Sequence, residues 1–197
     1  MRHDANVTHE VLSSPRLTLR RFHPSDGAAL HRCLGDPEVV RYEPYRPMTL
    51  EECQAEAARR CTDVAFRAVV LDGPDPVLIG NLWLSLDRPD LRTWQLGYVL
   101  SRDWWGRGLA TEACRTALDD VFGRGAHRVE ARCNPENAAS WRLLERLGMR
   151  REAHHLRAGS FWRDAAGEPI WHDTFVYAVL DDEWAARRMD GRAAAEG

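Results

Sequence analysis

The sequence predicts an α+β fold, in which helices cover both faces of one central mixed sheet. Segments that alternate polar and apolar residues, such as 16–20 and 128–133, predict half-buried strands. A segment with apolar residues at helical spacing, 109–121, lies between strand-like segments. No linker of the kind that separates domains interrupts the 197 residues, so we expect a single domain over residues 14–188.

Cap residues predict helices after the first strand. Pro24-Ser25-Asp26 supplies an N-cap for a helix over 27–34. Asp36-Pro37-Glu38 looks like a second cap, and we expect a short helix through Val40. Thr49 begins a further helix that runs to about Arg60, with acidic residues in its first turn, where the helix dipole favours them.

Strands and helices alternate in the remainder of the chain. We expect strands at 66–71, 77–86 and 93–100, then the helix at 109–121 and the strand at 128–133, a helix at 138–146, and strands near 150–157 and 174–180.

The two ends of the chain, residues 1–13 and 189–197, lack such patterns, and we expect them to be disordered. The N-terminus has no apolar leader region, and no apolar run approaches the roughly 20 residues of a membrane span. We therefore expect a cytoplasmic protein that does not bind membranes.

Composition excludes several classes of function. The net charge of −3 argues against a protein that binds nucleic acid through phosphates. All 27 basic residues are arginine, so no mechanism can use a Schiff-base or Walker-type lysine. The five cysteines have irregular spacing, which indicates neither a disulfide framework nor a zinc knuckle. We expect no metal site.

A glycine-rich turn stands between a strand and a helix at the centre of the chain. The apolar run from Leu96 to Leu100 precedes Gly106-Arg107-Gly108, and the helix begins at Leu109. Such a turn aims free backbone N–H groups at one point, where the helix dipole favours negative charge. The turn therefore suits a phosphate or pyrophosphate, although many Gly-x-Gly turns are only tight connections.

Four segments in the same order resemble the GNAT superfamily of N-acetyltransferases, and more narrowly its RimJ/RimL type, which acetylates ribosomal-protein N-termini. The resemblance covers about residues 14–184. It is carried by residues 14–20 with 36–39, by Tyr98-Val99-Leu100 with Trp104-Trp105-Gly106-Arg107-Gly108-Leu109-Ala110-Thr111-Glu112-Ala113, by residues 134–140 with 144–149, and by Trp171-His172-Asp173, Tyr177 and Glu183-Trp184.

The resemblance implies a mostly antiparallel sheet with a splayed cleft for acyl-CoA, and it assigns acetyl-CoA as the cosubstrate. The turn would bind the pyrophosphate through backbone N–H groups, and the strand edge would pair with the pantetheine arm. The cofactor-binding residues would be Tyr98, Val99, Leu100, Trp105, Gly106, Arg107, Gly108, Leu109, Ala110, Thr111 and Asn137.

The resemblance also implies direct attack of an amine on the thioester in a ternary complex, with Ser140 donating a proton to the departing thiolate. Many relatives place a Glu base where this chain has Gln95. Asp173 is our candidate for the base, with His172, Glu130, Glu152 and water as alternatives.

Each assignment has a structural alternative. Trp104 and Trp105 could pack in the core, Asn137 could be only an N-cap, and Ser140 could satisfy a backbone group. The adjacent pair His154-His155 would face opposite sides of a strand, so it makes a poor metal site.

The acceptor is a primary amine, and a peptide or protein N-terminus leads over a small-molecule amine such as an aminoglycoside-like drug. Tyr42, Trp83 and Phe161 are our candidates for the acceptor pocket. The nearby arginines, among them Arg41 and Arg46, leave an acidic acyl group possible. A non-catalytic acyl-CoA sensor is the alternative from another class, and a homodimer is possible.

Overall fold

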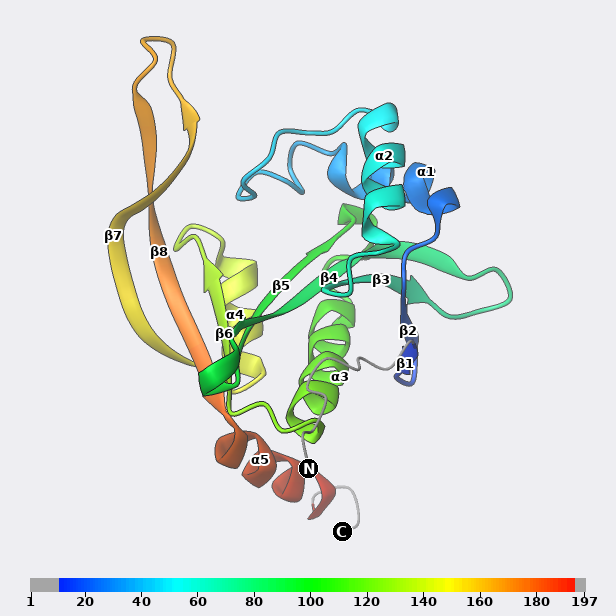
Figure 1. Ribbon diagram of the computed structural model, residues 1–197, viewed down its shortest axis with the longest axis vertical. Coiled ribbons are helices and arrows are strands. Elements are labelled where there is room, and N and C mark those ends of the chain that lie inside the picture. Colours follow the sequence, from blue (N-terminus) through cyan, green and yellow to red (C-terminus); the bar gives the residue numbers. More distant parts are fainter. Residues whose placement is uncertain (1–10, 194–197) are drawn as a thin grey trace.

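The structure is a computed structural model, in which residues 11–193 are described. Its centre is one eight-stranded sheet with the strand order β1-β2-β3-β4-β5-β6-β8-β7 (Figure 1). Every neighbouring pair is antiparallel except β5 and β6, which run parallel. The predicted mixed, mostly antiparallel sheet is therefore confirmed.

Most elements agree closely with the predicted segments, but β7 and β8 extend farther toward their hairpin than the predicted 150–157 and 174–180, and α5 was not predicted. The strands are β1 (Val11–Ser13), β2 (Leu17–Arg20), β3 (Phe66–Leu71), β4 (Val77–Arg88), β5 (Thr93–Leu100), β6 (Arg128–Cys133), β7 (Arg150–Arg163) and β8 (Pro169–Leu180). The helices are α1 (Gly27–Leu34), α2 (Leu50–Arg60), α3 (Leu109–Gly123), α4 (Ala138–Arg146) and α5 (Asp181–Ala193).

Helices cover both faces of the sheet, as predicted, and each face has its own core. Val69 of β3 packs with α3 and α4 residues such as Leu118 and Leu144. Its neighbours on the strand, Ala68 and Val70, join the core formed with α1 and α2. Successive side chains on a strand point to opposite faces, so one short strand contributes to both cores.

The cleft arises where β5 and β6 separate. Their parallel pairing ends at Leu96 and Ala131. From there β5 continues to Leu100 as the partner of β4 alone, and β6 continues to Cys133 as the partner of β8 alone. Peptide groups on one edge of β5 therefore face an opening instead of a neighbouring strand.

Several sequence expectations need correction. Residues 11–13, expected to be disordered, pair with β2 as β1, and residues 189–193 continue α5. The helix α5, which lies beyond the last predicted strand at 174–180, is anchored by Trp184, which stacks on Phe122. The remaining expected disorder, at 1–10 and 194–197, lies outside the described residues.

The short helix expected at residues 36–40 is a single turn. The Asp36 side chain accepts a hydrogen bond from the Glu38 N–H, and the N–H groups of Val39 and Val40 both donate to the Asp36 carbonyl. A short polar side chain that binds the backbone in this way competes with helix formation. Along the described part of the chain, no helix is both long and apolar enough to cross a membrane.

Candidate functional site

Residues 105–111, which we call the cradle, join β5 to α3 through two left-handed glycines. Gly106 has a φ of 72° and Gly108 a φ of 75°, a conformation that costs little only for glycine. The N–H of Glu112 donates to the Gly108 carbonyl, which begins the hydrogen bonding of α3. The N–H groups of the first turn, ahead of Glu112, have no partner within the helix and are available to an anion.

Side chains from the turn between β1 and β2 hold the cradle in place. The carboxylate of Glu112 accepts hydrogen bonds from the Ser14 hydroxyl and from the Nε and backbone N–H of Arg16, at 2.7–2.9 Å. Nη1 of Arg16 also donates to the Arg107 carbonyl at 3.1 Å. No local sequence pattern predicts a role for Arg16 and Glu112, because their contact joins residues almost a hundred positions apart.

The cradle opens on a cavity of about 780 Å³, a size typical of small-molecule sites. Its walls are β5, the end of β6, the start of α4 and residues 38–43, which lie between α1 and α2. Ten of the eleven predicted cofactor-binding residues line it: Tyr98, Val99, Leu100, Trp105, Gly106, Gly108, Leu109, Ala110, Thr111 and Asn137.

Arg107 is the predicted cofactor-binding residue that does not line the cavity. Its guanidinium lies 4.9 Å from the centre of the Trp104 ring. The side chain is therefore engaged in a cation–π contact beside the cradle, and the backbone of the cradle, rather than this side chain, faces the cavity.

Comparison with known proteins agrees with this geometry. A family model described as an acetyltransferase (GNAT) domain matches residues 16–150. The chain belongs to the GNAT family of acetyltransferases. Enzymes of this family use acetyl-CoA, which the cradle and the open edge of β5 suit in shape and in hydrogen-bonding groups.

This GNAT enzyme is similar in sequence to two curated relatives and in fold to one solved structure. It is 29% identical over 174 residues to the uncharacterized N-acetyltransferase YnaD of Bacillus subtilis, covering 88% of this chain and 98% of YnaD. It is 31% identical over 116 residues to the [ribosomal protein uS5]-alanine N-acetyltransferase of Escherichia coli, covering 54% of this chain and 60% of that enzyme. A GNAT-family acetyltransferase from Bacillus anthracis superposes with a TM-score of 0.77 at 28% identity, over 88% of this chain and 99% of the other.

Ser140 of the GNAT enzyme lies on the cavity wall, next to a tyrosine hydroxyl. Its Oγ is 2.9 Å from the Tyr98 hydroxyl oxygen, and the same hydroxyl donates to the Ser140 carbonyl at 3.3 Å. Burial raises the pKa of Tyr98 far above its ordinary value, so this phenol keeps its proton at neutral pH. Both residues were site candidates from the sequence, but their pairing could not be predicted because 42 positions separate them.

Asn137 has the structural role that the sequence left open. Its Oδ1 accepts the N–H of Ser140 at 3.1 Å and so caps α4, while the residue also lines the cavity. This cap fixes the first turn of α4, and with it the position of Ser140.

Asp173, the candidate base, does not line the cavity. It lies on β8, where its carboxylate accepts the backbone N–H of Arg157 at 2.9 Å and contacts His154 Nε2 at 2.8 Å. The Arg157 N–H, followed by His154, lowers the pKa of Asp173, which makes its carboxylate a weaker base. These contacts link β7 to β8. Because they hold Asp173 away from the cavity walls, the geometry does not support a catalytic role for this residue.

The alternative bases also lie outside the cavity walls. Glu130 and Glu152 both pair with Arg128, and the His172 ring stacks on Phe161 at 5.8 Å. The sequence could not exclude these groups, because their distance from the cleft depends on strand register.

Of the three predicted acceptor-pocket residues, the structure brings only Tyr42 to the cavity. Trp83 pairs with Gly97 across β4 and β5 and lies over it, on the sheet. Phe161 lies on the β7–β8 hairpin, with 46% of its surface exposed.

Glu43 is a cavity residue that the sequence analysis did not name as a candidate. Burial raises its pKa to about 7, although a hydrogen bond with Tyr45 lowers it in part. Its neighbour Tyr42 was expected in the acceptor pocket, but the burial of Glu43 is set by packing that the sequence does not display.

Proposed function

We propose that this GNAT enzyme transfers the acetyl group of acetyl-CoA to the α-amino group of a peptide or protein N-terminus. The neutral amine nitrogen attacks the thioester carbonyl carbon, the carbon–sulfur bond breaks, and the CoA sulfur leaves as a thiolate that takes up a proton. The nitrogen loses one proton in the same process. No oxidant, reductant or metal is needed for this balance.

The observation that carries the proposal is the long β7–β8 hairpin, whose Trp162 contacts Arg46 just beyond the cavity-lining residues 38–43. It extends well beyond the body of the sheet, as Figure 1 shows. Four large apolar side chains are exposed along the hairpin: Leu156, Phe161, Ile170 and Trp171. Apolar surface spread along a hairpin suits contact with an extended polypeptide better than contact with a small amine. The partial similarity to the uS5-alanine N-acetyltransferase favours the same class of acceptor.

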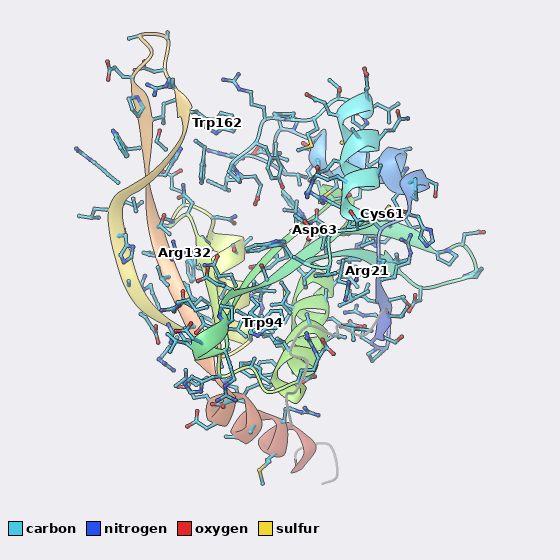
Figure 2. The ribbon with its side chains drawn as sticks, in the orientation of Figure 1. Arg21, Cys61, Asp63, Trp94, Arg132 and Trp162 are labelled. Atoms are coloured by element: carbon cyan, nitrogen blue, oxygen red, sulfur yellow. The ribbon has the colours of Figure 1, made fainter. Side chains whose placement is uncertain are left out.

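The hairpin approaches the segment between α1 and α2. The guanidinium of Arg46 lies 5.0 Å from the centre of the Trp162 ring, and Figure 2 shows Trp162 on the side of β7 that faces this segment. A peptide that entered between the hairpin and residues 38–43 would reach the cavity with its amino terminus first.

The geometry supports the following roles for the site residues, which are part of the proposal. The cradle binds the pyrophosphate through its backbone, and the free edge of β5 pairs with the amides of pantetheine in the manner of strand addition. A backbone N–H near Val99 or Leu100 polarises the thioester carbonyl. Ser140, supported by Tyr98, donates the proton to the thiolate.

A direct transfer is favoured over an acyl-cysteine intermediate. Of the described residues that line the cavity, one is a cysteine, Cys133. Burial raises the pKa of its thiol to about 11. A thiol that stays protonated at neutral pH is a poor nucleophile.

Release of CoA thiol from acetyl-CoA tests the proposal when purified protein is offered free-amino peptides beginning with alanine, serine or methionine. Matched peptides with a blocked N-terminus and a panel of aminoglycosides and polyamines serve as comparisons. Turnover confined to the free-amino peptides supports the proposal. Turnover confined to the small amines would instead assign a small-molecule acceptor, and acetyl-CoA binding without turnover on any amine would indicate a sensor.

A further inference from the structure

Residues 38–43, apart from Val40, line one wall of the cavity onto which the cradle opens. The Tyr42 hydroxyl of this segment lies 3.5 Å from the Glu136 carbonyl, in the turn that precedes α4. The segment thus spans from α1 toward α4 and lies next to the end of β5, where Val99 and Leu100 line the same cavity. This is the region in which the thioester carbonyl would be held under the proposed function.

Three glutamates line the cavity, and their environments differ. Glu38 forms an ion pair with Arg41 at 3.3 Å, and Glu136 is exposed to solvent. Glu43 is half-buried, and within residues 11–193 none of the ion pairs includes it. Its carboxyl therefore has no cation to hold it permanently ionised.

We propose that Glu43 is the catalytic base of this enzyme and accepts a proton from the ammonium form of the acceptor. The inference rests on the proposed function, since it takes the acceptor amine to reach the cavity beside residues 38–43. The N–H bond of the ammonium breaks and an O–H bond forms on the Glu43 carboxylate. The neutral amine then attacks, and Glu43 returns its proton to solvent before the next turnover.

The surroundings of Glu43 suit this exchange. Burial raises its pKa to about 7, and Tyr45 from the same segment donates a hydrogen bond that limits the rise. The thiol of Cys33 on α1 is close enough to interact with Glu43, and Arg60 on α2 interacts with both Cys33 and Tyr45. A base whose pKa lies near the working pH is both partly ionised and able to take the proton, which is the favourable condition for general-base catalysis.

The decisive experiment compares the pH dependence of kcat/KM for wild type and Glu43→Gln between pH 6 and 9, with a free-amino alanyl peptide as the acceptor. Wild type is expected to show a limb controlled by a group with a pKa near 7. In Glu43→Gln that limb disappears, and kcat/KM at pH 7 falls about 30- to 100-fold. The deficit shrinks toward pH 9, where the α-amino group is already neutral in solution.

Three controls separate a lost base from a disturbed fold. The Kd of CoA should stay within about twofold in Glu43→Gln, because the cradle is untouched. Glu43→Asp keeps a carboxylate and should restore part of the rate together with the limb near pH 7. Glu51→Gln removes the same charge from an exposed position in the first turn of α2 and should behave as wild type.

Glu43→Gln with the wild-type rate and pH profile would overturn the inference. A midpoint below pH 5 for the Glu43 carboxyl, followed by carbon-13 NMR, would overturn it as well, whichever acceptor is used. Failure of the proposed function would show differently, as wild-type protein that does not acetylate peptides. The pH profiles of wild type and Glu43→Gln would then be compared with whichever amine the enzyme acetylates. If it acetylated no amine, the NMR midpoint of the Glu43 carboxyl would still test the inference.

Discussion

The indole N–H of Trp105 donates a hydrogen bond of 2.8 Å to the carbonyl oxygen of Leu100, the last residue of β5. The bond crosses the turn between the strand and the cradle, and it fixes the distance between the two surfaces that would hold the two ends of acetyl-CoA. Trp105 is 47% exposed, so its role is to brace the cavity wall and not to fill the core.

Trp105→Phe removes this hydrogen bond and keeps the aromatic surface. We expect the Kd of CoA to rise about three- to tenfold, the equivalent of one hydrogen bond of about 1 kcal/mol, while the unfolding midpoint changes little. Isothermal titration calorimetry and urea unfolding measure the two quantities. Trp105→Leu should weaken binding further, and a Trp105→Phe protein with wild-type affinity would show that the bond is incidental.

The left-handed conformation of Gly108 makes a second prediction. A β-branched residue at a φ of 75° is strained by about 1–3 kcal/mol, and relief of that strain would turn the cradle N–H groups away from their common point. Space is not the obstacle, because a Cβ there would meet only the end of the Arg16 side chain, at 3.7 Å. Gly108→Val is therefore expected to lose CoA binding in calorimetry while circular dichroism shows the fold retained.

Gly123 offers the matched control for this change. It lies at the end of α3, and a Cβ added there would meet nothing within 4 Å. Gly123→Ala should bind CoA as wild type does. Equal loss of binding in both variants would assign the effect to general destabilisation of α3 and contradict the role of the cradle.

The hydroxyl pair of Tyr98 and Ser140 predicts a loss of rate with little loss of affinity. Ser140→Ala removes the hydroxyl proposed to protonate the thiolate, and we expect kcat to fall about 10- to 100-fold with the Kd of acetyl-CoA unchanged within a few-fold. Tyr98→Phe leaves the serine in place and should have a smaller effect. A double variant that is no slower than Ser140→Ala would establish that the two hydroxyls act as a unit, and an unaffected kcat in Ser140→Ala would exclude it as the acid.

Glu112 predicts how stability depends on pH. Burial raises the pKa of Glu112, but the hydrogen bonds from Ser14 and Arg16 and the charge of Arg16 more than offset this, and the net pKa is lowered. A lowered folded-state pKa adds stability above the unfolded value of about 4.3, and this stability is lost as pH falls through the folded value. Glu112→Gln should therefore be less stable than wild type by about 1 kcal/mol at pH 7, a figure discounted for the half-exposed Arg16 partner.

Urea unfolding at pH 7 and at an acidic pH below the lowered folded-state pKa of Glu112 measures this difference, which should shrink as the pH falls through that pKa because the carboxylate then takes up its proton. Glu168→Gln, at an exposed position of the β7–β8 hairpin, should show no such pH-dependent difference. A constant gap between wild type and Glu112→Gln at both pH values would mean that the carboxylate charge contributes nothing.

Local patterns in the sequence determined most of the elements around the site. The strand at 93–100, the strand at 128–133 and the helix at 138–146 have the bounds that alternation and cap residues predict. Glycines at 106 and 108 predicted the shape of the cradle for the same reason, since the conformation of a turn depends on the residues within it.

Tertiary structure alone decided which side chains face the cavity. Arg107 turns to the Trp104 ring, Asp173 stays on the hairpin with His154, and Glu43 enters the cavity wall. It also decided that residues 11–13 form a strand and that the chain remains helical to Ala193, through pairing with β2 and the burial of Trp184. The reason is physical: alternation and capping act between neighbours along the chain, whereas burial, strand pairing and pKa shifts depend on groups that only folding brings together.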